Sequence, residues 1–379
     1  MQRTHSLLAL IFISLGTASA QWQLQTSNTT ADLRGIHSIG NGVAWASGAN
    51  GTVLRTEDGG YVWQSCSIPP NAEYLDFRGI QAFDANTAIV MSSGKGHLSR
   101  LYKTTDGCHS WKLLFTNPDK DGCWDALYID RGKWGWLLGD PVRGAFVLFD
   151  TDNGGKTWTR KHNKGLSADP AAQGAFAASN SSLMAPVSSV TFGSGGTVGA
   201  FIYRRAQLQI CLDECSKEDL DPEGRRDKWE RQSLPLGAHS ETSGIFSIGT
   251  KNGSGANPPL NPLVIAVGGD YSKPDDSSGT AAWSADWAEH WNTAQTPPHG
   301  FRSAVAYDEQ TKTWITVGPN GTDLSTDDGK NWRPLLPNPA LHDAPDADKN
   351  WNALSLPFVV GPKGRIGKLN PTAIPTRPS

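Results

Sequence analysis

Three arginines hold equivalent places in three copies of a short apolar segment. They are Arg34 in LRGI, Arg78 in FRGI and Arg302 in FRSA. A guanidinium group presents paired N–H donors that match a carboxylate or a phosphate. If the three side chains converge, they predict an anion-binding site; the alternative is that each one pairs with a local acid such as Asp125.

Two aspartates follow glycines at the ends of small apolar segments, Asp140 in GDP and Asp270 in GGDY. Aspartate often closes turns by accepting backbone N–H groups, and the alternative is that both carboxylates join the arginines in a polar site. Tyr271 would act as a nucleophile only in a sialidase-like mechanism, where tyrosine takes the place of a carboxylate. The candidate ligand-binding residues are Arg34, Arg78, Asp125, Asp140, Asp270, Tyr271, Arg302, Asn320 and Lys363.

A second group of polar residues belongs to an eight-residue pattern, [ST]-x-[DN]-x-G-x-x-W, of which five copies occur. Its hydroxyl and its Asp or Asn side chain can accept backbone N–H groups and close a turn, and its glycine suits a positive φ. Cys108 and Ala288 replace that glycine in two copies, so we expect looser turns there. Five scattered copies favour a structural role over catalysis or metal binding. The residues concerned are Asp58, Asp106, Asn153, Asp286 and Asp327, with Trp63, Trp111, Trp158, Trp291 and Trp332.

The segments around each copy alternate between short apolar strands and glycine-rich turns, with no helix of consequence. Repetition at this period predicts a β-propeller, in which each four-stranded antiparallel blade carries one copy. The interval from Trp158 to Trp291 is long enough for two blades, and Trp229 marks the missing copy. We therefore predict an all-β, seven-bladed propeller over residues 21–369, closed by the N-terminal strand Trp22–Gln25 in the last blade.

The eight-residue pattern resembles the Asp-box, or bacterial neuraminidase repeat (BNR), of β-propellers. Longer runs resemble the photosystem II stability/assembly factor-like propellers, in particular their exported bacterial branch. These runs are GDPVRG (139–144), VGGDYSKP (267–274), GPNGTDLSTDDGKNW (318–332) and GPKGRI (361–366). The resemblance covers nearly all of residues 22–369. It implies the propeller fold and, only in general terms, a binding or assembly role, because one fold hosts many functions.

The two ends of the chain differ in composition from the rest. Residues 1–20 are typical of a secretory signal, with Arg3, an apolar stretch and small residues up to Ala20. We expect cleavage after Ala20 and a secreted or periplasmic protein. No later run approaches the ~20 apolar residues of a membrane-spanning helix. Residues 370–379 are Pro-rich, and we expect a loose tail there.

The formal net charge is −3, and no basic stripe interleaved with aromatic residues occurs, so nucleic acid is not an expected partner. Cys211 and Cys215 lie in a charged insertion and could form a disulfide, while at most one pair can form among Cys66, Cys108 and Cys123. The spacings do not match a zinc site, and no dinucleotide, haem or flavin motif is present. We therefore expect no metal and no cofactor.

Two classes of function fit these observations. The first is an exported, monomeric, non-catalytic propeller that binds a protein partner or assists complex assembly, with an anion site at the channel mouth for an acidic small molecule or glycan. The alternative is a carbohydrate-active enzyme on the same face, either a sialidase-like glycoside hydrolase or a polysaccharide lyase. The segment around Arg34 lacks the proline of the sialidase Arg-Ile-Pro motif, and no Glu–Tyr pair is evident. We favour the binding protein.

Overall fold

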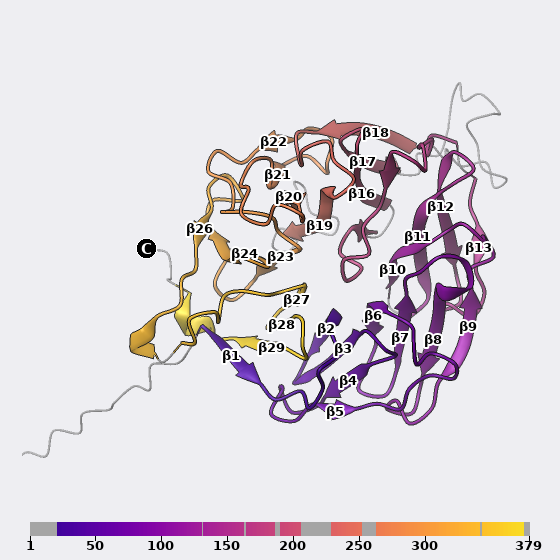
Figure 1. Cartoon of the computed structure of the whole chain (residues 1–379), viewed down its shortest axis with the longest axis horizontal. Helices are drawn as coiled ribbons and strands as arrows, with labels where there is room; N and C mark the ends of the chain where they lie inside the picture. Colours follow the sequence, from indigo (N-terminus) through magenta and orange to yellow (C-terminus); the bar gives the residue numbers. More distant parts are fainter. Residues whose placement is uncertain are drawn as a thin grey trace, which may run out of the picture.

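A computed structural model describes residues 21–130, 132–162, 164–185, 190–205, 229–251, 263–341 and 343–374. Within these ranges the chain forms strands and three short 3₁₀ turns, η1 (Gly96–Leu98), η3 (Pro339–Leu341) and η4 (Pro371–Ala373), and no α-helix. The sheets stand side by side around a common centre, as in a propeller (Figure 1). The all-β prediction is confirmed. No helix in the described ranges is both long enough and apolar enough to cross a membrane.

Four sheets run outward from the centre in sequence order, and each is antiparallel. They are β2 (Leu33–Gly40), β3 (Val43–Gly48), β4 (Val53–Thr56), β5 (Gln64–Ser65); β6 (Phe77–Ala82), β7 (Ala88–Ser92), β8 (Arg100–Thr104), β9 (Lys112–Thr116); β10 (Trp124–Asp130), β11 (Trp134–Val142), β12 (Ala145–Thr151), β13 (Thr159–Arg160); and β23 (Ala304–Asp308), β24 (Thr313–Gly318), β25 (Gly321–Ser325), β26 (Arg333–Pro334).

A fifth four-stranded sheet contains both ends of the chain. It consists of β27 (Ala353–Ser355), β28 (Phe358–Val360), β29 (Ile366–Leu369) and β1 (Trp22–Gln25). β1 pairs antiparallel with β29, from Trp22 opposite Leu369 to Gln25 opposite Ile366. The N-terminal strand is therefore the outer strand of the last sheet in the sequence.

The remaining strands form one nine-stranded sheet that resembles two units joined. It contains β14 (Gln173–Gly174), β15 (Leu183–Met184), β16 (Val190–Gly196), β17 (Ala200–Arg205), β18 (Trp229–Leu234), β19 (Ser243–Lys251), β20 (Leu263–Asp270), β21 (Ala281–Ser284) and β22 (Asn292–Thr293). β16 and β19 are joined by a single pair, Gly195 opposite Gly244. Dividing the sheet there gives β15–β18 and β19–β22, with β14 as an additional short strand paired with β16.

The five repeats form the turns between the third and fourth strands of their sheets. In the first, the Thr56 hydroxyl accepts from Gly60 N–H (3.0 Å) and the Asp58 carboxylate accepts from Val62 N–H (3.0 Å). Cys108 and Ala288 keep the same left-handed backbone, with φ of 66° and 64°. Their N–H groups also lie 3.0 Å from the hydroxyl. The expectation of looser turns is wrong, because both residues adopt the left-handed backbone and keep the hydrogen bond to the hydroxyl.

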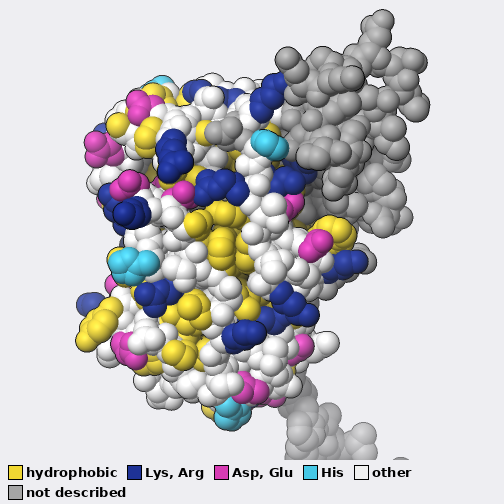
Figure 2. Space-filling model, turned by 90° about the vertical axis from the view of Figure 1, so that its right-hand side faces the viewer, with side chains coloured by type: hydrophobic (Ala, Val, Ile, Leu, Met, Phe, Trp, Pro, Cys, Tyr) yellow, Lys and Arg dark blue, Asp and Glu magenta, His cyan; other side chains and the backbone are white. Residues whose placement is uncertain are grey.

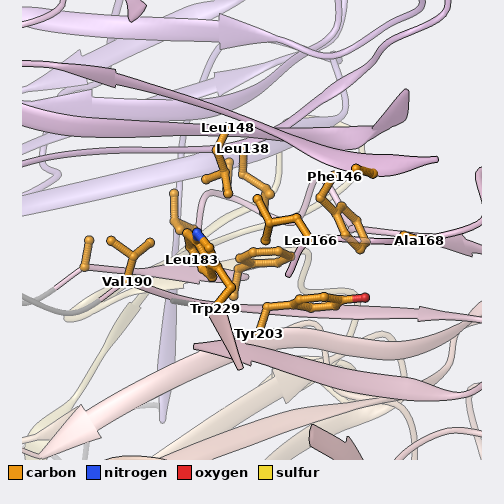
Figure 3. Close-up of a cluster of buried hydrophobic side chains, with 13 residues drawn as sticks. Leu138, Phe146, Leu148, Leu166, Ala168, Leu183, Val190, Tyr203 and Trp229 are labelled. Carbon is orange, nitrogen blue, oxygen red and sulfur yellow. The ribbon is translucent and has the colours of Figure 1, made fainter. Parts of the chain in front are cut away.

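The hydrophobic core lies between neighbouring sheets. One cluster packs Leu138 and Leu148 of the third sheet against Tyr203 and Trp229 of the next unit (Figure 3). Trp229 is 6% exposed and begins β18, the outer strand of a unit that has no repeat of its own. It fills the place between units that the repeat tryptophans occupy elsewhere; Trp63, for example, meets Phe358 of the last sheet edge-to-face.

A disulfide between Cys66 and Cys108 ties the first sheet to the second, with Cα atoms 5.3 Å apart. Cys123 is a free thiol. The suggested Cys211–Cys215 disulfide and the signal segment 1–20 lie outside the described residues.

Residues 370–374 are not a loose tail, because Asn370 N–H donates to the Gln21 carbonyl and Ile374 is buried.

The outer side of the molecule that faces right in Figure 1 carries charges of both signs. Lys and Arg side chains there are interspersed with Asp, Glu and apolar side chains (Figure 2). Long basic side chains also cover aromatic rings, as Arg160 does over Phe149 (4.8 Å) and Lys103 over Phe83 (5.7 Å).

Candidate functional site

A cavity of about 690 Å³ lies where the innermost strands of several sheets begin. Arg34, Arg78 and Asp125, which line it, are each the second residue of an innermost strand. Side chains from the middle and the end of the chain complete the wall, among them Tyr271 and Trp351. The cavity therefore lies at the centre of the ring, on one face, and receives residues from units far apart in sequence.

Arg34 and Arg78 form a basic wall around a shared carboxylate. Asp76 lies 2.8 Å from Arg78 Nε and 3.9 Å from Arg34 Nε, and Asp32 lies 3.7 Å from Arg34 Nη2. Both arginine side chains are about one-third exposed, at 37% and 34%. Each guanidinium carries five N–H donors, and these contacts engage only one or two of them in the described part of the chain. Both side chains line the cavity, where their guanidinium groups can meet an anion.

Arg302 does not join this wall, so the prediction that three arginines converge is wrong. Its side chain is fully buried, and Nε donates to the Asp323 carboxylate at 2.8 Å. Nη1 donates to the Asn320 side-chain oxygen (2.6 Å) and to the Phe301 carbonyl (2.7 Å). Arg302 thus pairs with a local acid, although that acid is Asp323 rather than Asp125. Asn320 is part of the same network and not of the cavity.

The reason for this difference is a change of side-chain direction at one strand. In β2 and β6 the residue directly after the arginine pairs with the second strand (Gly35 with Ser47, Gly79 with Met91), whereas in β23 it is the second residue after Arg302, Ala304, that takes this place opposite Val317. Because side chains of extended backbone alternate between two faces, a shift of one residue exchanges the inward and outward positions. Phe301 consequently lines the cavity, and Arg302 lies behind it.

Two other predicted residues lie away from the ligand-accessible wall. Asp270 is 3% exposed and accepts from the hydroxyls of Ser240, Thr242 and Ser272 at 2.6–2.9 Å. Burial alone would raise the pKa of Asp270, but these hydrogen bonds together lower it to about 2. It therefore closes a turn. Lys363 is exposed in a separate depression with Asp346, and its backbone N–H donates to Asp32.

Asp125 and Asp140 do come together, beside the free thiol of Cys123. The ligand atoms of the three side chains all lie within 4.8 Å of one another. Burial, and then repulsion from Asp140, raise the pKa of Asp125 well above its usual range, although Arg78 opposes this. Burial raises the pKa of Asp140 to about 6, and burial with the two carboxylates raises the pKa of Cys123 to about 12. Acidic groups are in excess at this corner, where Cys123 and Asp125 line the cavity and Asp140 lines the neighbouring depression.

Four aromatic rings form an apolar wall. Phe176 stacks on Phe246 (3.8 Å between centroids), and Phe246 meets Phe301 edge-to-face at 4.7 Å. Tyr271 lies 6.0 Å from Phe246 and is 51% exposed. Sequence reasoning placed only Tyr271 at a ligand site. The position of Phe246 and Phe301 at the start of repeated segments was a usable signal, whereas Phe176 lies in a segment with no repeat pattern.

The segment that carries Phe176, residues 175–182 between β14 and β15, contacts the innermost strands of several sheets; we call it the channel loop. Its Ser179 hydroxyl accepts from Ile36 N–H (3.2 Å). Its Asn180 side chain accepts from Leu127 N–H and donates to the Ile80 carbonyl, both at 3.1 Å. These partners belong to the innermost strands of the first, third and second sheets. The loop therefore bridges three units, and it also supplies Ala175–Ala178 to the cavity.

No protein-family model matches the chain, and no curated protein matches its sequence. Solved structures do share its fold. YCF48 bound to D1 peptide is 16% identical with a TM-score of 0.56, and the match covers 92% of this chain and 96% of that one. YCF48 from Cyanidioschyzon merolae is 17% identical (TM-score 0.58), with 93% of this chain and 100% of that chain covered. The GH74 xyloglucanase from Xanthomonas campestris is 14% identical (TM-score 0.56), with 95% of this chain but only 55% of that chain covered. At these identities the likeness shows the propeller fold alone.

Proposed function

We propose that the chain is a binding propeller that holds an extended segment of a partner protein in the central cavity. The main support for this proposal is that the cavity has two walls of different chemistry, one basic and one aromatic. Arg34 and Arg78 come from β2 and β6, and Phe246 and Phe301 lie at β19 and just before β23, across the ring (Figure 1). A ligand that spans the cavity meets cationic N–H donors on one side and aromatic rings on the other.

A peptide with a carboxylate close to an apolar side chain satisfies both walls. Guanidinium groups bind carboxylates through paired hydrogen bonds, and aromatic rings supply the buried contact area that dominates most interfaces. The cavity volume of about 690 Å³ falls within the range of roughly 300–1,000 Å³ typical of ligand pockets and suits a few residues of chain. That a YCF48 propeller with this fold has been solved with a bound peptide supports a peptide ligand.

We further propose that this binding takes place outside the cytoplasm, after removal of residues 1–20, and that the chain belongs to the exported branch of Asp-box propellers. The support is the composition of the N-terminal segment and the Cys66–Cys108 disulfide, because disulfides persist in oxidising compartments. Cell fractionation with detection of the mature N-terminus tests this part of the proposal. An N-terminus at Gln21 in the exported fraction supports it, and an uncleaved cytoplasmic chain contradicts it.

A selection from a peptide library with free C termini tests the binding function. We expect enrichment of peptides that combine a carboxylate with an aromatic or large aliphatic residue. The same selection with an Arg34→Ala/Arg78→Ala variant should lose that enrichment. Equal enrichment by both proteins would contradict the assignment of the cavity as the binding site.

One observation favours the alternative of a carbohydrate-active enzyme. Asp125, which lines the cavity, and its neighbour Asp140, which lines the adjacent depression, are carboxyl groups with raised pKa values, as general acids in glycosidases are. Their separation, within 4.8 Å between ligand atoms, is shorter than the roughly 5–9.5 Å of glycosidase pairs. No glutamate from the described residues lines the cavity beside Tyr271, as a sialidase-like mechanism would require. Turnover of xyloglucan, a sialoside or a uronate polymer that is lost in Asp125→Asn would establish the enzyme instead.

A further inference from the structure

The acidic corner of the cavity combines three potential metal ligands on two paired strands. Asp125 is the second residue of β10, Cys123 lies just before that strand, and Asp140 lies in β11. The Asp140 N–H donates to the Cys123 carbonyl at 2.9 Å, which fixes the two strands at this point. The thiol sulfur and one oxygen of each carboxylate lie within 4.8 Å of one another.

An independent observation shows that one of these carboxylates lacks a partner. Asp125 is 3% exposed and lines the cavity, and its Oδ2 has no hydrogen-bond partner among the described residues. An unpaired buried carboxylate is costly unless a proton or a cation neutralises it. This oxygen is buried beside a second carboxylate and a thiol, and from this position it can coordinate a cation.

The ionised side chains around Cys123, Asp125 and Asp140 carry more negative than positive charge. Arg34 and Arg78 are the cations of this wall, and Arg78 Nε is bonded to Asp76. Asp32 and Asp76 lie beside these arginines, Arg78 also acts on the charge of Asp125, and Asp140 lies next to Asp125. Asp32 and Asp76 balance the two arginines, so Asp125, Asp140 and a Cys123 thiolate carry three negative charges when ionised, and a divalent cation offsets two of them.

We propose that Cys123, Asp125 and Asp140 form a binding site for a zinc ion. Zinc accepts thiolate sulfur and carboxylate oxygen together, whereas magnesium and calcium prefer oxygen alone. Tetrahedral zinc, at its usual bond lengths, holds ligand atoms roughly 3.5 Å apart, so small side-chain rotations close the present spacing. On binding, a zinc–sulfur bond replaces the S–H bond, and the proton leaves to solvent. Three protein ligands leave a fourth position for a water or another ligand.

Titration of the metal-free full-length protein with Co²⁺ and Zn²⁺ tests this site. Cobalt bound to a thiolate gives a sulfur-to-metal charge-transfer band, which reports directly on the cysteine. We expect that band at one ion per chain, its loss on addition of zinc, and its absence in Cys123→Ser. Asp140→Asn keeps an acceptor for Ala175 N–H and should weaken zinc binding at least about tenfold.

Two controls separate this site from other metal ligands. Cys211→Ser/Cys215→Ser removes the two cysteines that lie outside the described residues, and His290→Ala removes a ligand from the exposed group Asp286, Glu289 and His290. Both variants should keep the band. Thermal unfolding of each metal-free variant establishes that it is folded. Absence of the band in the wild type, or its persistence in a folded Cys123→Ser variant, would overturn the proposal.

Discussion

The guanidinium of Arg302 donates to the carboxylate of Asp323 through Nε at 2.8 Å and again through Nη2, and both side chains are at most 1% exposed. Burial would raise the pKa of Asp323, but hydrogen bonding with His299 and the charge of Arg302 hold it below its usual range. The pair therefore remains ionised inside the protein. It anchors the segment before β23 and fixes Phe301 in the cavity wall.

We predict that Arg302→Ala destabilises the protein by about 3–5 kcal/mol, because it leaves the Asp323 carboxylate buried without its cation. Arg78→Ala, which removes a one-third-exposed ion pair, should cost no more than about 1 kcal/mol. Urea unfolding of both variants measures the difference. Equal stability of the two variants would show that the buried pair does not have the structural role assigned to it.

The pH dependence of stability should include a contribution from His37. Burial lowers the pKa of His37 to about 4, and Nδ1 accepts from Ala82 N–H of the next sheet at 3.1 Å. Because the unfolded chain binds this proton near pH 6.5 and the folded chain only near pH 4, stability falls as the pH is lowered through that window. The free energy of unfolding falls by at most about 3 kcal/mol over this window, and by less because water reaches the half-buried His37 ring.

Comparison of the wild type with His37→Asn from pH 4 to pH 7 isolates this contribution. Asparagine retains an acceptor for Ala82 N–H without titrating in that range. The comparison is needed because Asp140, with a pKa raised to about 6, changes stability in the opposite direction over the same window. Identical pH profiles for the two proteins would contradict the lowered pKa of His37.

The repeats should contribute to stability and not to binding. Ser325 is 1% exposed, accepts from Gly329 N–H (3.0 Å) and donates to Asp327 (2.9 Å). Ser325→Ala should cost about 1–3 kcal/mol, because it leaves a buried N–H without its acceptor. The exposed Glu309→Ala on the same sheet should change stability by less than about 0.5 kcal/mol. A loss of peptide binding in a folded Ser325→Ala variant would argue for a functional role of the repeats.

The Cys66–Cys108 disulfide closes a loop of sequence separation 42, and its entropic effect on the unfolded chain predicts a contribution of up to about 4 kcal/mol. Cys66→Ala/Cys108→Ala should therefore unfold at markedly lower denaturant concentration, whereas Cys123→Ser should not. Denaturation of the oxidised protein and the two variants measures this. A wild-type midpoint in the double variant would show that the bridge contributes nothing to stability.

Much of the fold could be predicted from the sequence because it repeats. Each repeat forms a turn through hydrogen bonds between residues two to four apart, so the pattern can be recognised locally. The cavity depends instead on where each innermost strand begins. The difference of one residue that moves Arg302 out of the cavity and Phe301 into it has no local signal. The position of the channel loop has no local sequence signal either, because its Asn180 forms hydrogen bonds with partners in two other sheets.

The central claim is that the cavity binds a peptide between its basic and aromatic walls. The most direct measurement is the fluorescence anisotropy of a labelled hexapeptide that ends in Glu-Phe with a free carboxylate, titrated with wild type and with single variants. We predict that Arg78→Ala and Phe246→Ala each weaken binding about tenfold or more, that amidation of the peptide weakens it as well, and that Lys363→Ala has no effect. Equal affinity of the wild type and both cavity variants, or no binding by the wild type, would contradict the account.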